Sequence, residues 1–558
     1  SCASIERLSE DIQEKPTRFS YQGYLPLLSY SYELLKKHFN NVIENSTPAV
    51  SLEVQGEVAV ISGKLKVQIA IINEDRQKAP IYDVTVTIEE TEDFKLDGEP
   101  VEIFDTIRGG EQKMVELPLK ISKKLIVQKI GDFQLVCKYK ARNLNDYLII
   151  KSGQTISLYD KSEFEPIENI FARYANSNAV KDEEIFKGRD TFIEDIINTF
   201  LTSHSKCVVI YGQKRSGKSS VLYHLKKRLN ATQRAFCIDF SLGSLITEWS
   251  ITAFYNKILS EIDKELRRLK RNGDGVPLFE KPSIASLEKH PTSIFQETME
   301  EFLDQCQELD QWKNKKLTVL IDEFTYLYSS IQRGSIPSDF MKVWKDIVDQ
   351  SYFNSVLIGQ DVMPDFMAQF PNQFGVVEDK RLNYLDSKDA KELIERPIWN
   401  IEKDESRFLG KAVDKIIDYT AGNPYYIQIF GDRLVSYMND ACRSQVTELT
   451  VDEVAKSLTE GKDALLEKQF DNLLTAGDAD LERNPPEYTF EVLKQIAKAS
   501  KNFGYCSKES IAEYLINLNI KDKLDEILKD LHLRQVVSLK QGNYRIQVQL
   551  FQQWLLNH

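Results

Sequence analysis

A phosphate-binding loop is the clearest chemical pattern in the sequence. Residues 207–220 read CVVIYGQKRSGKSS, so an apolar run leads directly into the glycine–lysine–serine spacing of that loop, and a helical pattern follows. Glycines let backbone N–H groups approach phosphate oxygens, and the amino end of the next helix adds positive charge. The pattern predicts nucleotide binding by Gly212, Gln213, Lys214, Arg215, Ser216, Gly217, Lys218, Ser219 and Ser220.

The side chains of this loop have different expected roles. Lys218 is expected to bridge the β- and γ-phosphates, and the hydroxyl of Ser219 to bind Mg²⁺. Ser220 is expected to support Ser219. Arg215 is expected at the surface or at the rim of the phosphates rather than in catalysis.

A pair of acids follows a second apolar run. In LTVLIDEF, Asp322 ends the run and Glu323 comes next. With a phosphate-binding loop upstream, Asp322 is expected to hold Mg²⁺ and Glu323 to activate the water that attacks the γ-phosphate. On its own such a pair is often a solvated turn. Together the two motifs predict an ATPase that uses ATP, ADP and Mg²⁺.

The elements that must position these residues form an α/β pattern over residues 185–385. Short apolar runs alternate with helix-length segments, which predicts a parallel sheet covered on both faces. The expected strands are Cys207–Tyr211, Arg234–Ser241, Leu317–Asp322, Ser355–Gly359 and Lys380–Leu385. Residues 386–480 read as an all-helical lid. Residues 481–558 read as three helices and a hairpin around Gln541-Gly542, which is the pattern of a winged helix.

Apolar and polar residues follow a different pattern in the N-terminal third of the sequence. Residues 1–47 are expected to be helical or irregular, with a helical run at 27–39. Residues 48–162 alternate apolar and polar positions in several short runs, which predicts an antiparallel β-sandwich. It resembles immunoglobulin-like domains in build, and a spacer or docking role is favoured over direct ligand binding. Residues 163–184 are the expected linker, so the chain is predicted to be multidomain.

Two further segments resemble motifs of the AAA+ and STAND ATPases. Residues 185–190 (IFKGRD) resemble the GR box, although that family prefers Glu where this chain has Asp190; the resemblance implies that Arg189 helps to cover the adenine. Residues 421–426 (AGNPYY) resemble the Gly-x-Pro motif, which implies that Pro424 lies near the base. Alone, that segment is also an ordinary helix start.

Residues after the later strands have weaker assignments. In AAA+ enzymes a polar sensor residue near the γ-phosphate follows the strand that corresponds to Ser355–Gly359, so Gln360 is the candidate. Arg381 is expected at a sheet edge, with contact to phosphate as the alternative. No arginine finger acting from a neighbouring subunit can be identified, which favours slow hydrolysis.

The resemblance implies a STAND-type switch whose nucleotide state controls conformation and self-association. By analogy, such a protein would serve bacterial antiviral defence or stress signalling, with an unknown trigger. The alternative is a DNA-handling AAA+ ATPase of the origin-binding or transposition-regulator kind. DNA binding is disfavoured because acids crowd the third helix of the winged-helix segment, at Asp522, Asp525, Glu526 and Asp530. A scaffold with structural nucleotide is a third option, but it would not require Glu323.

The overall composition of the chain limits the functions that can be expected. The chain has 558 residues and a formal charge of −13, which argues against binding nucleic acid or anionic membrane over its whole surface. Its seven cysteines lack CxxC pairs, so neither a disulfide scaffold nor a zinc site is expected. The sequence has no apolar stretch of membrane-spanning length, and we expect a cytoplasmic protein. It opens with Ser1 and its first methionine is Met114, so the sequence is expected to be part of a longer gene product, with an upstream effector domain missing from it.

Overall fold

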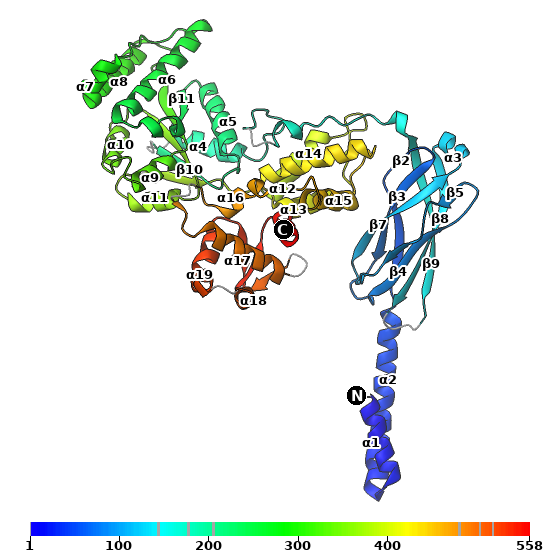
Figure 1. The fold of residues 1–558 in the computed structure, drawn as a ribbon. Helices are drawn as coiled ribbons and strands as arrows, with labels where there is room; N and C mark the ends of the chain where they lie inside the picture. The colour runs from blue at the N-terminus through cyan, green and yellow to red at the C-terminus, as the bar shows by residue number, and fades with distance from the viewer. Residues whose placement is uncertain are drawn as a thin grey trace. The chain divides into compact units, whose positions relative to one another are not determined.

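The computed structural model describes residues 2–141, 146–175, 179–202, 207–375, 377–477, 481–500, 504–515 and 518–558. Contacts divide the chain into two compact units (Figure 1). Unit 1 comprises Ser1–Pro166 and Met438–Thr450, and unit 2 comprises Ile167–Tyr437 and Val451–His558. Within the described ranges, no helix combines the length and the hydropathy that a membrane span needs.

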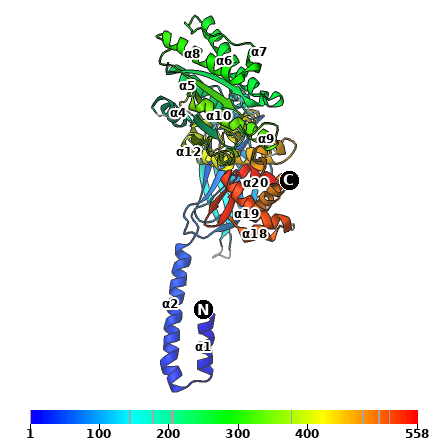
Figure 2. The ribbon, with the colours of Figure 1, turned by 90° about the vertical axis from the view of Figure 1, so that its left-hand side faces the viewer.

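Unit 1 begins with a helical hairpin. Helix α1 (Cys2–Glu14) and helix α2 (Leu25–Asn45) lie side by side and are joined through a short π-helix at Ser20–Tyr24 (Figure 2). Tyr32 of α2 donates a hydrogen bond of 2.6 Å to Glu6 of α1. The helical run expected at 27–39 therefore lies inside a longer helix.

A two-sheet β-sandwich follows the hairpin, as the alternating pattern predicts. One sheet has the order β1-β3-β7-β5 and the other β2-β9-β8-β4-β6. The pairings are antiparallel except that of β2 with β9, and the inward side chains of both sheets form one core. The strands are β1 (Val50–Gln55), β2 (Val58–Val60), β3 (Lys64–Asn73), β4 (Ile81–Glu89), β5 (Phe94–Leu96), β6 (Val101–Ile103), β7 (Gln112–Ile121), β8 (Ile130–Ala141) and β9 (Leu148–Asp160), with helix α3 (Lys123–Gln128) between β7 and β8.

Residues Met438–Thr450, which lie inside the range expected for the helical lid, belong to unit 1 by their contacts. Arg443 forms an ion pair with Glu116 of β7. The hydroxyl of Tyr159 in β9 donates a hydrogen bond of 2.5 Å to the carbonyl of Cys442. This segment therefore packs on the sandwich.

Unit 2 is built on a parallel sheet with the order β11-β12-β13-β10-β14. Its strands are β10 (Cys207–Tyr211), β11 (Ala235–Ser241), β12 (Lys316–Asp322), β13 (Asn354–Gly359) and β14 (Glu378–Arg381). The last strand was expected at 380–385 and instead ends at Arg381. Its partner β10 turns into the phosphate-binding loop after Tyr211, so the ladder between them cannot continue.

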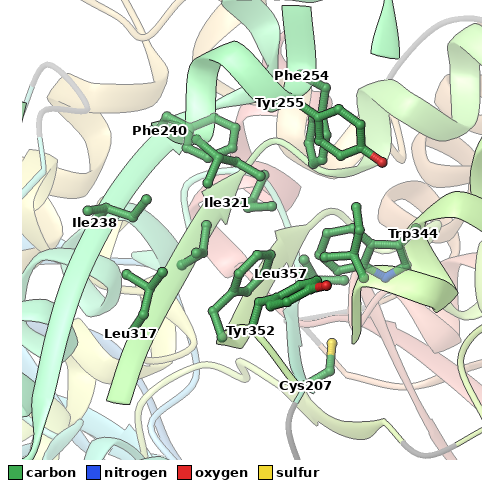
Figure 3. Close-up of a cluster of buried hydrophobic side chains, with 14 of the residues drawn as sticks. Cys207, Ile238, Phe240, Phe254, Tyr255, Leu317, Ile321, Trp344, Tyr352 and Leu357 are labelled. Atoms are coloured by element: carbon green, nitrogen blue, oxygen red, sulfur yellow. The ribbon is translucent and has the colours of Figure 1, made fainter. Parts of the chain in front are cut away.

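Both faces of this sheet are covered by helices, which explains why β10, β11, β12 and β13 are mainly apolar. The edge strand β14 is instead charged at all four positions. On β12, Leu317, Val319 and Ile321 join a cluster of large side chains on one face, whereas Leu320 joins the cluster on the other. Figure 3 shows the first cluster, where Phe254 and Trp344 reach the strands from the covering helices. The first face is covered by α6 (Ile251–Arg271), α8 (Pro291–Glu308) and α10 (Phe340–Asp349), and the second by α4 (Asp190–Thr202) and α5 (Lys218–Ala231).

The C-terminal part of unit 2 is helical with a small sheet, as expected. The sheet has the order β15-β17-β16. Its hairpin turns at Gln541 and Gly542, whose φ angles of 50° and 78° suit a two-residue turn with left-handed residues. The elements are α12 (Ser387–Glu395), α13 (Ala412–Thr420), α14 (Pro424–Asp440), α15 (Glu448–Thr459), α16 (Asp471–Leu474), α17 (Pro486–Ala499), α18 (Lys508–Glu513), α19 (Leu518–Leu533), α20 (Gln549–Asn557), β15 (Cys506–Ser507), β16 (Val537–Lys540) and β17 (Asn543–Ile546).

Candidate nucleotide-binding site

A cavity of about 490 Å³ lies at the carboxyl ends of β10, β12 and β13. In parallel sheets this edge is where ligands bind, because the loops that follow the strands converge there. The cavity is lined by the phosphate-binding loop from Lys214 to Ser220, by Asp322 and Glu323, and by Gln360. The fold therefore brings the two motifs predicted from the sequence to one place.

The backbone of the phosphate-binding loop requires its glycines. A Cβ atom on Gly212 would lie 2.7 Å from the carbonyl oxygen of Leu382, and Gly217 has a φ of 95°. Helix α5 begins at the next residue, Lys218. The hydroxyl of Ser216 is buried and has no hydrogen-bond partner in the described part of the chain. A phosphate group with its many acceptor oxygens fits such a loop.

Lys218 closes the loop from inside. Its ammonium donates hydrogen bonds of 2.9 Å to the carbonyl of Gly212 and 2.6 Å to that of Gln213. Burial lowers the pKa of Lys218 to about 8, although the carboxylates of Asp361 and Asp322 act in the opposite direction. A bound triphosphate would add negative charge and favour the protonated form.

Ser219 and Asp322 form the part of the site that suits Mg²⁺. The hydroxyl of Ser219 lies 3.4 Å from Oδ2 of Asp322, and the backbone N–H of Glu323 donates a 2.8 Å hydrogen bond to Oδ1. Burial raises the pKa of Asp322. Proteins usually hold Mg²⁺ with one or two carboxylates and with oxygens of the substrate. The described residues contain no group of three or more His, Cys, Asp or Glu that could hold a metal.

Glu323 is held by a residue that the sequence did not single out. Ser241, the last residue of β11, donates its hydroxyl hydrogen bond to Oε2 of Glu323. A Cβ on Gly243 would lie 2.7 Å from the same oxygen, so a side chain there would displace the carboxylate of Glu323 from this position. The φ of Glu323 is 57°, an uncommon value for a residue other than glycine. A polar residue at the end of the neighbouring strand was the available signal for Ser241.

Arg189 and Pro424 line the same cavity. The guanidinium of Arg189 is buried and donates a 2.6 Å hydrogen bond to the carbonyl of Asn383. A Cβ on Gly217 would lie 4.0 Å from Cγ of Pro424, so the start of α14 lies close to the loop. The covering of an adenine by these two residues stays a prediction.

Gln360 also lines the cavity, and its Oε1 atom is buried without a partner among the described residues. Arg381 is directed elsewhere. Its guanidinium donates hydrogen bonds of 3.2 and 3.0 Å to Asp361, a buried carboxylate whose pKa is raised by burial. Arg381 therefore forms an internal ion pair next to the site, and it is not a lining residue of the cavity.

The side chains of Gln213, Lys214 and Arg215 contact C-terminal elements of unit 2 rather than standing free. Gln213 is buried; it accepts a 2.7 Å hydrogen bond from Tyr384 and donates one to the carbonyl of Arg534. Lys214 and Arg215 each lie 2.9 Å from the carboxylate of Asp471 in α16.

Arg215 has two further contacts, a 2.9 Å hydrogen bond to the carbonyl of Gln469 and the ring of Tyr425 at 4.6 Å. Ser220, expected to support Ser219, accepts a 2.9 Å hydrogen bond from the backbone N–H of Val180. Of the loop residues expected to bind nucleotide, the side chains of Gln213, Lys214, Arg215 and Ser220 are thus already bonded to protein.

One family model matches the part of the chain that contains the phosphate-binding loop and the Asp322–Glu323 pair. Residues 201–367 match the family model described as an AAA domain. A search of curated proteins finds no match. A Walker-type ATPase of Pyrococcus abyssi is 16% identical, with 68% of this chain and 99% of that one covered and a TM-score of 0.46.

Two other solved structures are similar at a lower level. The RuvB Holliday junction branch migration motor of Thermotoga maritima is 12% identical, with 67% and 96% of the two chains covered and a TM-score of 0.33. Cdc6p of Pyrobaculum aerophilum is 14% identical, with 70% and 98% covered and a TM-score of 0.29. TM-scores below 0.5 carry no argument about function. The family match and the converging motifs identify the central α/β part of the chain as an AAA-family P-loop ATPase domain.

Proposed function

We propose that this protein is a slowly hydrolysing ATP switch of the STAND type, in which the bound nucleotide controls conformation and thereby self-association. Mg²⁺ and the γ-phosphate would distinguish the ATP-bound from the ADP-bound form.

The observation that carries the proposal is the set of contacts made by three consecutive loop residues. Gln213 donates a hydrogen bond to the carbonyl of Arg534, which follows α19. Lys214 and Arg215 form ion pairs with Asp471 in α16. The loop that would hold the phosphates is thus attached directly to the C-terminal helical region. A phosphate group that shifts this loop or competes for its cations would change those contacts.

The ion pairs of Asp471 contribute only part of the energy that such a switch needs. The pairs of Asp471 with Lys214 and Arg215 are partly exposed, and such pairs contribute up to about 1 kcal/mol each. Moving a switch from 1:99 to 99:1 takes about 5.5 kcal/mol of differential binding. Release of Asp471 alone is therefore insufficient, and the contacts of the γ-phosphate with Lys218 and the metal site must supply the larger part.

Hydrolysis would depend on Glu323. Its carboxylate lies in the cavity wall and is oriented by the hydroxyl of Ser241. In that position it can accept a proton from a water that attacks the γ-phosphate, while Lys218 stabilises the charge on the phosphate oxygens.

Hydrogen exchange tests the coupling. With Mg-ATP bound, backbone amides of residues 467–474 and 530–537 should exchange at rates different from those with Mg-ADP, because their contacts with the loop change. Residues 255–265 in the middle of α6, far along the chain from the loop contacts, serve as the internal reference. Equal exchange with both nucleotides at saturation would refute the switch while leaving nucleotide binding intact.

A further inference from the structure

Two side chains of α5 hold one residue of the segment that precedes the ATPase sheet. Ser220 and His224 are four positions apart, so they lie on one face of the helix. The hydroxyl of Ser220 accepts a 2.9 Å hydrogen bond from the N–H of Val180, and Nε2 of His224 lies 3.1 Å from the carbonyl of Val180. Both backbone polar groups of Val180 are therefore bonded to the helix that begins in the phosphate-binding loop.

His224 also supports a second residue of this segment. Its ring is stacked on the ring of Phe186, with centroids 3.8 Å apart and an interplanar angle of 14°. His224 is completely buried, and burial lowers its pKa, which favours the neutral imidazole. A neutral ring with its proton on Nε2 can donate to the carbonyl of Val180 and still stack on Phe186.

Val180 and Phe186 form one wall of the nucleotide cavity. Together with Ile185, Leu385 and Leu393 they make one part of its lining apolar, whereas Asp322 and Glu323 make another part acidic. The phosphates belong beside the loop and the acids. The apolar wall suits a flat heteroaromatic base, which is bound mainly by burial of its faces.

We propose that Ser220 and His224 are positioning residues for the nucleotide base: they tie the wall formed by Val180 and Phe186 to the helix that carries Lys218 and Ser219. Base and phosphates would then be held by one rigid element at a set separation. The inference rests on the proposed function, because it takes the cavity to be an ATP site.

The test compares two ligands that share phosphates and differ in the base. Dissociation constants for Mg-ATP and for inorganic tripolyphosphate with Mg²⁺ are measured by calorimetry on the full chain. His224→Phe keeps an aromatic ring and loses the hydrogen bond, His224→Gln keeps a donor and loses the ring, and Ser220→Ala loses the acceptor. Ser220→Thr keeps the hydroxyl that Ser220→Ala removes.

We expect His224→Phe and Ser220→Ala each to weaken ATP binding by about ten-fold, the equivalent of one lost hydrogen bond. His224→Gln loses the ring that is stacked on Phe186 and should weaken ATP binding by about two- to ten-fold. In all three variants the affinity for tripolyphosphate should stay within about two-fold of the wild type. Ser220→Thr should recover the affinity for ATP. His558→Phe is the matched control, because Nδ1 of His558 also lies 3.0 Å from a backbone carbonyl, that of Trp554, and its ring is stacked on that of Trp554. It should leave the ratio of the two affinities unchanged.

Three results would overturn the inference. Unchanged ATP affinity in all three variants would show that the wall does not depend on α5. An equal loss for both ligands would show damage to the phosphate-binding loop instead of the base wall, and the proposed function would stand. A wild-type chain that binds neither ligand would overturn the proposed function, and this inference with it.

Discussion

Glu323 directly follows β12, and its carboxylate accepts a hydrogen bond from Ser241, a geometry that suits the water activation we propose for it. We expect Glu323→Gln to bind Mg-ATP as the wild type does and to lower kcat by about 10²- to 10⁴-fold, because the amide cannot accept the proton. Steady-state phosphate release and equilibrium binding measure the two effects. Glu288→Gln on α7 (Ile284–Lys289) is an exposed control. Normal turnover by Glu323→Gln would show that another group is the base.

Lys218 gives the site a pH dependence. In the structure its pKa is about 8, because burial disfavours the ammonium. Below pH 8 the lysine is already protonated, so the affinity for Mg-ATP should be nearly constant there. Above pH 8, binding must also protonate the lysine, so the dissociation constant should rise by up to about ten-fold per pH unit. Calorimetry from pH 6.5 to 9.5 measures this.

Lys218→Ala controls for other titrating groups. This variant should bind Mg-ATP weakly and without the rise in the dissociation constant above pH 8. A wild-type affinity that stayed flat to pH 9.5 would contradict the lowered pKa.

At the scale of elements, α16 opposes the phosphate-binding loop. Asp471 forms ion pairs with Lys214 and Arg215, so Asp471→Asn removes one negative charge beside these two cations and should tighten ATP binding by about two- to five-fold. Asp452→Asn is the matched control, since Asp452 of α15 pairs with Lys415 of α13. Weaker binding by Asp471→Asn would mean that the ion pair holds the loop in its binding shape.

The third helix of the winged-helix segment is α19, and one of its acids differs from expectation. Asp530 does not face solvent: it is buried and forms ion pairs of 2.6 Å with Arg483 and 3.1 Å with Arg534. Asp525 remains exposed and pairs with Lys508. The role of Asp530 is thus to fasten α19 to the elements before it.

Asp522, Asp525 and Glu526 remain exposed on α19, where they would repel phosphates, so we expect no duplex DNA binding above background at low salt, measured by fluorescence anisotropy. An affinity that falls steeply with salt concentration would favour the DNA-handling alternative, because such a slope reports contacts with phosphates.

At the scale of the whole molecule, the proposed switch predicts a nucleotide-dependent particle mass. Mg-ATP with the Glu323→Gln variant, which cannot use up its ligand, should give assemblies larger than those with Mg-ADP in light scattering. Lys218→Ala should stay at the ADP mass in both nucleotides. A monomer under all conditions would argue for a role without assembly.

The sequence by itself determined the parts of the site that depend on local spacing. The phosphate-binding loop, the Asp322–Glu323 pair and the succession of strands along the chain follow from short motifs and from runs of apolar residues, because a strand, a turn and a helix start are set by neighbouring residues. The order of the strands within the sheet did not follow from them. The ends of strands were predicted less accurately. Strand β14, for example, ends where the adjacent β10 turns into the phosphate-binding loop.

Only the tertiary structure decided which distant residues complete and restrain the site. Gln213 meets Arg534 across 321 positions of sequence, and Lys214 meets Asp471 across 257. The contact of Ser241 with Glu323 and that of His224 with Val180 were likewise visible only in the structure. These contacts arise from the packing of whole elements. The residues next to a side chain in the sequence do not specify which distant surface it will contact.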